Sequence, residues 1–179
     1  MDRLRHWFRP SDIVLALALL TRLPLPHNPS AGRAPAAAAW AYPLVGLVVG
    51  ALALAVGAAL TWLGVAAPVT AAFVLLTTIL VTGAMHEDGL ADCADGFWGG
   101  WTVERRLEIM KDSTIGTYGV IALTLSLILR WHLLTQLIDK GALLAAVLVA
   151  GVISRAGMVW VMHQLPNARR AGLSAQTGR

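Results

Sequence analysis

The residues best suited to chemistry lie in one stretch, His86 to Gly100, between two long apolar segments. Asp88, Asp92 and Asp95 are spaced i, i+4 and i+7, so a helix would place their carboxylates on one face. Carboxylates stacked in this way repel each other, and a bound cation would relieve the repulsion. Oxygen ligands alone suit Mg²⁺ or a similar hard ion. The spacing therefore predicts a divalent-metal site, because a solvated acidic turn would have no need of a shared face.

Further residues that could act on a phosphate follow this stretch. Glu108 and Asp112 are four residues apart, which would place both carboxylates on one face of a helix over Val103–Asp112. Lys111 could neutralise a phosphate while Asp112 holds a metal or takes a proton; on an exposed helix the same pair would simply be solvated. His86, beside the acidic face, is a candidate proton acceptor or a group that supports a metal ligand.

Four other polar residues lie near or within apolar segments. Arg22 is placed to bind a phosphate near the membrane, with a lipid headgroup as the alternative. Arg155 lies about two turns inside the last apolar segment and would face the acidic site or an anionic substrate, unless it extends to the membrane surface. Arg130 and His132 would pair with neighbouring helices or face a polar cavity.

The composition indicates an integral membrane protein. Of the 179 residues, 57% are hydrophobic and only 13% are charged, and the mean hydropathy is +0.67. Soluble domains carry about 25% charged residues. The formal net charge is +4, but the basic residues flank apolar runs, which favours a role in membrane orientation over nucleic-acid binding. The single cysteine, Cys93, excludes an internal disulfide.

Apolar runs and helix breakers divide the chain into helices. The basic segment Arg3–Leu23 lacks a signal-peptide cleavage site, and its apolar run is shorter than the about 20 residues that a span needs, so we expect an interfacial helix. Gly46-xxx-Gly50 predicts the close approach of another helix. The expected spans are Ala36–Ala67, Val69–Met85 extended by the first turns of the acidic stretch, Val120–Ile138 and Ala142–Met162, and Thr102 caps a cytoplasmic amphipathic helix.

The predicted fold class is therefore all-α. We expect a polytopic membrane helix bundle of about four transmembrane spans, with the interfacial and the amphipathic helix added, as a single integral membrane domain over residues 1–179. With four spans, eleven of the 14 lysines and arginines fall on the side of the acidic stretch, and only Lys140 falls on the other. The positive-inside rule then predicts a multi-pass protein of the cell (inner) membrane with both termini and the active site on the cytoplasmic side.

Acids on two helices, surrounded by basic residues, suit phosphoryl-type transfer at the cytoplasmic membrane face. A cation neutralises a diphosphate, and an acid positions or deprotonates the incoming hydroxyl. Two other classes of membrane protein could carry the same residues. A cation channel or transporter subunit would favour acids near the middle of the bilayer, whereas these cluster at one face. A purely structural subunit would leave the acidic face unexplained.

A resemblance to a known family narrows this chemistry. The stretch HEDGLADCADG (residues 86–96), followed by Arg106 and by IMKDSTIGTYG (residues 109–119), resembles the cobalamin synthase family. TRLP (21–24) and ARRAGL (168–173) match the family in position and order, so the resemblance covers nearly the whole chain. The central motif is long enough to be highly specific.

The resemblance implies an adenosylcobinamide-GDP ribazoletransferase. In that reaction the 3′-hydroxyl of α-ribazole, or of its 5′-phosphate, attacks the cobinamide-linked phosphorus and GMP leaves. Mg²⁺ is the implied cofactor; membrane lipid is an expected partner, nucleic acid is not, and a homo-oligomer is left open. The implied metal ligands are Asp88, Asp92, Asp95 and Asp112. With the candidates above, the catalytic residues are Asp112, Asp95 and His86, and the substrate-binding residues are Arg22, Lys111, Arg155, Arg169 and Gly96.

A shorter similarity keeps a related activity open. Asp92-xx-Asp95-Gly96 is similar to the opening of the CDP-alcohol phosphotransferase signature, and Glu108-xxx-Asp112 is similar to its closing acids. The full signature is absent, since no Ala-Arg follows Gly96 at the expected offset. Where both patterns apply, Asp112 is the candidate base and the first three acids bind metal.

Two departures from the family pattern stand out. Cys93 takes a position where the family commonly has Thr, a change that conserves size. The chain ends at Arg179, where family members usually continue with further apolar segments. We therefore expect the domain to lack the C-terminal spans usual in the family, and with them part of the substrate pocket.

Overall fold

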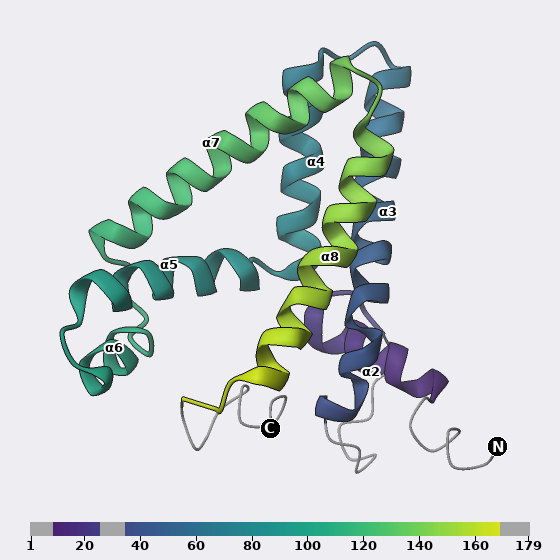
Figure 1. The fold of residues 1–179 in the computed structure, drawn as a ribbon. Coiled ribbons are helices and arrows are strands. Elements are labelled where there is room, and N and C mark those ends of the chain that lie inside the picture. Colours follow the sequence, from purple (N-terminus) through teal and green to yellow (C-terminus); the bar gives the residue numbers. More distant parts are fainter. Residues whose placement is uncertain (1–8, 26–34, 169–179) are drawn as a thin grey trace. The chain divides into compact units, whose positions relative to one another are not determined.

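The computed structural model describes residues 9–25 and 35–168, and every regular element in these ranges is a helix (Figure 1). In chain order the elements are α2 (Pro10–Leu20), the 3₁₀ helix η1 (Pro35–Ala41), α3 (Tyr42–Trp62), α4 (Ala67–Thr82), α5 (Met85–Gly99), α6 (Val103–Ile109), α7 (Thr117–Asp139) and α8 (Leu143–Gln164). The all-α prediction is confirmed.

Three helical stretches in the described ranges are long and apolar enough to cross a membrane, namely Pro35–Trp62, Thr117–Asp139 and Leu143–Gln164. They match the predicted first, third and fourth spans. The first ends at Trp62 rather than Ala67, because Gly64 follows with a left-handed φ of 75°. A further span exists only if α4 and α5 are taken together, so the structure has three spans, or four with that pair. The chain is a polytopic helical membrane protein.

The chain forms two compact units. One contains the described residues up to Ala55 together with those from Leu144 onward, and the other is Val56–Leu143. Helix α3 runs from the first unit into the second. The acidic stretch and the segment after it lie wholly in the second unit, so the candidate site can be built from that unit alone.

In the first unit, α2 packs against η1. The fully buried carboxylate of Asp12 accepts the indole N–H of Trp40, with 2.9 Å between Nε1 and Oδ2. Such donors make the burial of a carboxylate tolerable. Of the predicted interfacial helix Arg3–Leu23, a helix is confirmed over Pro10–Leu20, whereas residues 1–8 lie outside the described ranges. Its position at the membrane interface stays a prediction.

Glycines bring α3 and α8 into backbone contact, also within the first unit. A Cβ on Gly46 would collide with the carbonyl group of Gly151, and a Cβ on Gly151 would lie 2.6 Å from the carbonyl oxygen of Gly46. A Cβ on Gly50 would lie 3.2 Å from the side chain of Leu148. The close helix approach predicted from Gly46-xxx-Gly50 is therefore confirmed.

In the second unit, the chain bends sharply between α4 and α5. Helix α4 ends at Thr82, Gly83 takes a left-handed φ of 64° as its C-cap, and Ala84 follows with a φ of 58°. The axes of the two helices differ by 87°. The span predicted over Val69–Met85 therefore does not continue into the acidic stretch as one straight helix, because two successive left-handed residues end the helical hydrogen bonding and redirect the chain; the two helices meet the length and composition of a span only as a bent pair.

Helix α7 contacts both arms of this bend and forms the third side of a triangle with α4 and α5 (Figure 1). The indole Nε1 of Trp131 donates to the carbonyl oxygen of Pro68 at 2.7 Å, which ties α7 to the start of α4. The other end of α7 begins at Thr117, beside α5. The two arms and α7 thus hold each other in place, and the acidic helix is positioned by contacts along its length.

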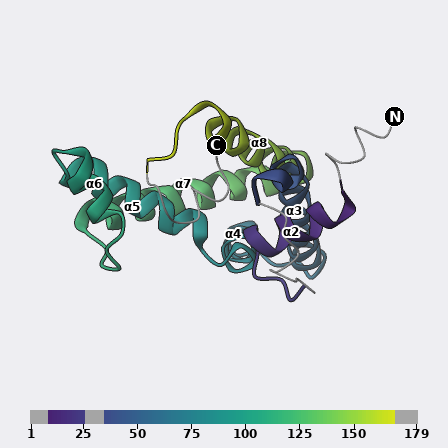
Figure 2. The ribbon, with the colours of Figure 1, turned by 90° about the horizontal axis from the view of Figure 1, so that it is seen from below.

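Helix α6 packs beside the C-terminal end of α5 (Figure 2). Thr102 caps α6 as predicted, since its hydroxyl accepts the backbone N–H of Arg105 at 3.2 Å. The helix is three residues shorter than the predicted Val103–Asp112. The carboxylate of Asp112 instead accepts the backbone N–H of Thr114 at 3.1 Å, a local turn that competes with continued helix.

Candidate functional site

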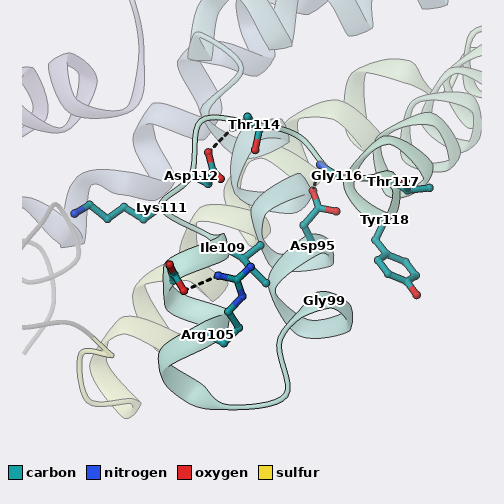
Figure 3. A pocket seen from close by; sticks show the side chains of 11 residues that line it. Asp95, Gly99, Arg105, Ile109, Lys111, Asp112, Thr114, Gly116, Thr117 and Tyr118 are labelled. Atoms are coloured by element: carbon teal, nitrogen blue, oxygen red, sulfur yellow. Dashed lines mark hydrogen bonds and ion pairs between the residues drawn. The ribbon is translucent and has the colours of Figure 1, made fainter.

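A cavity of about 600 Å³ lies among α5, α6 and the first turn of α7 (Figure 3). Its lining combines the carboxylates of Asp95, Glu108 and Asp112, the cations of Arg105 and Lys111, the hydroxyls of Thr114, Thr117 and Tyr118, and Gly99, Ile109 and Gly116. The cavity therefore brings together three of the predicted site residues, Asp95, Lys111 and Asp112. Its mixture of anions, cations and hydroxyls suits a charged ligand that carries hydrogen-bond acceptors.

Asp95 joins the acidic helix to the start of α7. Its Oδ2 accepts the backbone N–H of Gly116 at 2.7 Å, and its Oδ1 accepts that of Gly119 at 2.9 Å. Gly116 is the N-cap of α7 and has no side chain with which to bond the free amides of the first turn. Asp95 supplies that cap from another helix, and its own side chain is buried, with 8% of the residue surface exposed.

Asp112 and Lys111 lie in the loop that follows α6, at the edge of the cavity (Figure 3). Both are exposed. Oδ1 of Asp112 accepts the backbone N–H of Thr114, and Oδ2 makes no hydrogen bond within the described residues. The predicted helical face shared by Glu108 and Asp112 does not form, since α6 ends before Asp112; instead Glu108 pairs with Arg105 at 2.7 Å.

The remaining predicted residues of the acidic stretch do not line the cavity. Asp88 is exposed and Asp92 is half-buried; they lie on α5 on the face that also carries Asp95. His86 is half-buried in the first turn of α5. Gly96 is buried, and a Cβ there would lie 2.7 Å from Cγ of Met110. Gly96 therefore lets the segment after α6 pack tightly on α5.

The predicted substrate-binding arginines outside this region belong to the first unit or to the undescribed tail. Arg22 is exposed directly after α2. Arg155 is half-buried in α8, and its Nη1 donates to Oγ of Ser154 at 2.9 Å. Arg169 lies outside the described residues. Contact between these arginines and the acidic helix or its ligand stays a prediction.

The carboxylates fit one mode of metal binding and not another. Within residues 9–25 and 35–168, no three His, Cys, Asp or Glu side chains are grouped so that they could hold a metal ion. The four predicted ligands are therefore not assembled into a site made by the protein alone. Mg²⁺, however, is usually held by one or two carboxylates together with substrate phosphates and water. Asp88 and Asp92, one turn apart on α5, could supply the two carboxylates that this second mode requires.

Several residues of the cavity were missed from the sequence. Thr114, Thr117 and Tyr118 place three hydroxyls on its wall, and Arg105 adds a cation. The ring of Tyr118 also lies 6.4 Å, centroid to centroid, from that of Trp98. The signal was present in STIGTYG (residues 113–119), where glycines alternate with hydroxyl side chains directly before an apolar helix. That composition is typical of loops that approach a polar ligand closely.

Comparison with known proteins identifies relatives over almost the whole chain. A family model described as cobalamin-5-phosphate synthase matches residues 12–179. A protein of Mesorhizobium japonicum is 47% identical over 93% of this chain and 64% of its own length. One of Bradyrhizobium diazoefficiens is 46% identical over 94% of this chain and 65% of its own length. One of Pelodictyon phaeoclathratiforme is 42% identical, with 93% and 64% covered.

These three relatives are all named adenosylcobinamide-GDP ribazoletransferase. The chain spans less than two thirds of the length of each of them, between 64% and 65%. No solved structure matches the chain.

Proposed function

Because the chain belongs to the cobalamin-5-phosphate synthase family, we propose that it carries the phosphoryl-transfer site of an adenosylcobinamide-GDP ribazoletransferase. In the proposed reaction the 3′-hydroxyl of α-ribazole, or of its 5′-phosphate, attacks the phosphorus that bears cobinamide. A new P–O bond forms, the phosphoanhydride bond to GMP breaks, and GMP leaves with the electron pair. The hydroxyl proton passes to a base. The products are adenosylcobalamin, or its phosphate, and GMP.

The observation that carries this proposal is the cavity beside α5, in which Asp95 of the acidic motif and Asp112 lie with cations and hydroxyls. Lys111 and Arg105 would neutralise diphosphate oxygens, and Thr114 or Thr117 would donate to them. Asp112 is the proposed base, because its Oδ2 makes no hydrogen bond within the described residues and lies on a loop open to solvent. General-base assistance of this kind typically contributes about 10²–10⁴ in rate.

Magnesium is the proposed cofactor. Asp88 and Asp92, which follow each other by one turn on the face of α5 that carries Asp95, would hold it together with the diphosphate. When bound, the ion would neutralise charge on the diphosphate. We further propose that the site faces the cytoplasm at the cell membrane, in accordance with the excess of basic residues on its side.

The test is a transfer assay. Membranes containing the chain are incubated with adenosylcobinamide-GDP, α-ribazole and Mg²⁺, and GMP release is followed by chromatography. We expect release that stops when Mg²⁺ is chelated and returns when it is restored. The variant Asp92→Asn should insert and fold normally while GMP release falls to background.

Two outcomes would overturn the proposal. The first is the absence of GMP release from membranes in which the chain is inserted and folded. The second is the release of CMP from a CDP-linked alcohol donor under the same conditions without any reaction of the cobinamide donor, which would favour the CDP-alcohol phosphotransferase alternative. Mg²⁺ uptake into sealed vesicles without either reaction would instead favour a transporter subunit.

A further inference from the structure

We infer that Asp95 is a positioning residue of the site and not a metal ligand or base, an inference that rests on the proposed function only for its catalytic consequence. Both oxygens of its carboxylate are engaged by backbone amides of α7, at 2.7 Å from Gly116 and 2.9 Å from Gly119. The side chain is buried, and it lies at the positive end of the helix dipole. The charge of this carboxylate is therefore compensated by the protein itself.

The space around the carboxylate supports the same role. A Cβ added to Gly116 would collide with Oδ1 of Asp95, and one added to Gly119 would collide with Oδ2. The α7 backbone is therefore in van der Waals contact with both oxygens, which leaves no room on that side for an ion. By contrast, Gly89 on the same helix faces open space, since a Cβ there would meet no atom within 4 Å.

The two glycines are explained by this contact and not by backbone conformation. Gly116 has φ −91° and ψ 175°, values that any residue adopts. Gly119 lies in the first turn of α7, where alanine would favour the helix by about 1 kcal/mol. Glycine at both positions is therefore required by the approach of the carboxylate. Asp95, Gly116 and Gly119 therefore form one junction, although the two glycines lie 21 and 24 residues after Asp95 along the chain.

The junction of Asp95 with Gly116 and Gly119 determines the shape of the cavity. It joins α5 to the start of α7, and the segment that bears Lys111 and Asp112 runs from the end of α6 to this junction. If the junction opened, Lys111 and Asp112 would move away from their positions beside α5. Loss of the Asp95 side chain would therefore lower turnover because Lys111 and Asp112 are displaced, without a change in the affinity for metal.

The first test measures the junction itself. In the ¹⁵N-glycine-labelled chain in detergent, the amide protons of Gly116 and Gly119 should exchange slowly, and Asp95→Ala should accelerate both by about 10- to 100-fold. The signals are assigned with Gly116→Ala and Gly119→Ala. Gly89→Ala, on the same helix in open space, is the matched control and should leave the exchange rates unchanged. Unchanged exchange at both glycines in Asp95→Ala would overturn the inference.

The second test separates positioning from metal binding. Mn²⁺ with GDP serves as the probe, and bound Mn²⁺ is measured by electron paramagnetic resonance. Asp95→Asn and Gly119→Ala should lower the kcat for GMP release by similar factors and leave Mn²⁺ affinity within twofold. A tenfold or larger loss of Mn²⁺ affinity in Asp95→Asn, without such a loss in Gly119→Ala, would overturn the inference. If no variant, wild type included, binds Mn²⁺, the magnesium proposal fails and the exchange test still decides the role of Asp95.

Discussion

Arg130, in the middle of α7, forms an ion pair with Glu87 in the first turn of α5, with 2.7 Å between Nη1 and Oε1. Nη2 of Arg130 also lies 3.4 Å from the hydroxyl of Thr78 on α4. One guanidinium therefore contacts both arms of the bend. Oε2 of Glu87 is buried and has no hydrogen-bond partner among the described residues. The negative charge of this carboxylate is consequently compensated by Arg130, and the pair ties the start of the acidic helix to α7.

Removal of either partner should destabilise the protein. Arg130→Gln or Glu87→Gln should lower the free energy of unfolding by about 1–3 kcal/mol, because the remaining charge loses its partner in a partly buried place. The double variant should lose less than the sum of the two, as expected for residues in contact. Thermal unfolding in detergent measures all three.

The exposed pair Arg105–Glu108 provides the control for this prediction. Its two atoms are also 2.7 Å apart, but the side chains are 58% and 69% exposed. Arg105→Gln should therefore change the free energy of unfolding by less than about 1 kcal/mol. Strictly additive effects of Arg130→Gln and Glu87→Gln would contradict a direct role of the pair.

Ala84 has a left-handed backbone conformation, and its replacement by glycine should raise the free energy of unfolding. At φ 58° a side chain is strained, so Ala84→Gly should stabilise the protein by about 1 kcal/mol. Ala84→Val should destabilise it, because a β-branched side chain tolerates that region worst. The matched control is Ala94→Gly within α5, which should destabilise the helix by about 1 kcal/mol. Urea or thermal unfolding in detergent measures the stability of the variants. A lower stability of Ala84→Gly would show that the backbone at Ala84 is not strained.

The crossing of α3 and α8 should tolerate no side chain. Gly151→Ala places a methyl group against the backbone of Gly46, which cannot rotate away, and should cost about 1–3 kcal/mol in unfolding free energy. Gly157, two turns further along α8, meets no atom within 4 Å, so Gly157→Ala should be neutral or mildly stabilising. The unfolding temperatures of the two variants are compared in the same detergent. Equal values would argue against backbone contact at Gly46.

Asp112 should matter for turnover and not for stability. Asp112→Asn keeps an oxygen that can accept the N–H of Thr114, so the unfolding temperature should stay constant. GMP release should fall by about 10²–10⁴, since the amide cannot accept the hydroxyl proton. Asp139→Asn, exposed at the far end of α7, is the control and should keep full activity. A variant Asp112→Asn with full turnover would exclude Asp112 as the base.

Local patterns in the sequence determined the class of protein and most of its helices. The apolar runs at Val120–Ile138 and Ala142–Met162 predict α7 and α8 to within three residues at each end, because burial in lipid requires continuous apolar helix. The spacing of Asp88, Asp92 and Asp95 on one helical face, and the capping of α6 by Thr102, depend on residues within a turn or two of each other. Such short-range features depend only on the local sequence, so they can be predicted without the tertiary structure.

Only the tertiary structure decided what those acids contact. The spacing alone treats Asp95 as equivalent to Asp88 and Asp92, and it gives no sign that the Asp95 carboxylate bonds backbone amides 21 and 24 residues away. The partner of Arg130 lies 43 residues before it, and the 87° bend that brings Glu87 to it follows from two successive left-handed residues. Side-chain periodicity specifies which face a residue occupies. The packing of whole helices determines which distant backbone segment contacts that face. The packing energy comes from many contacts, so no single local sequence pattern predicts it.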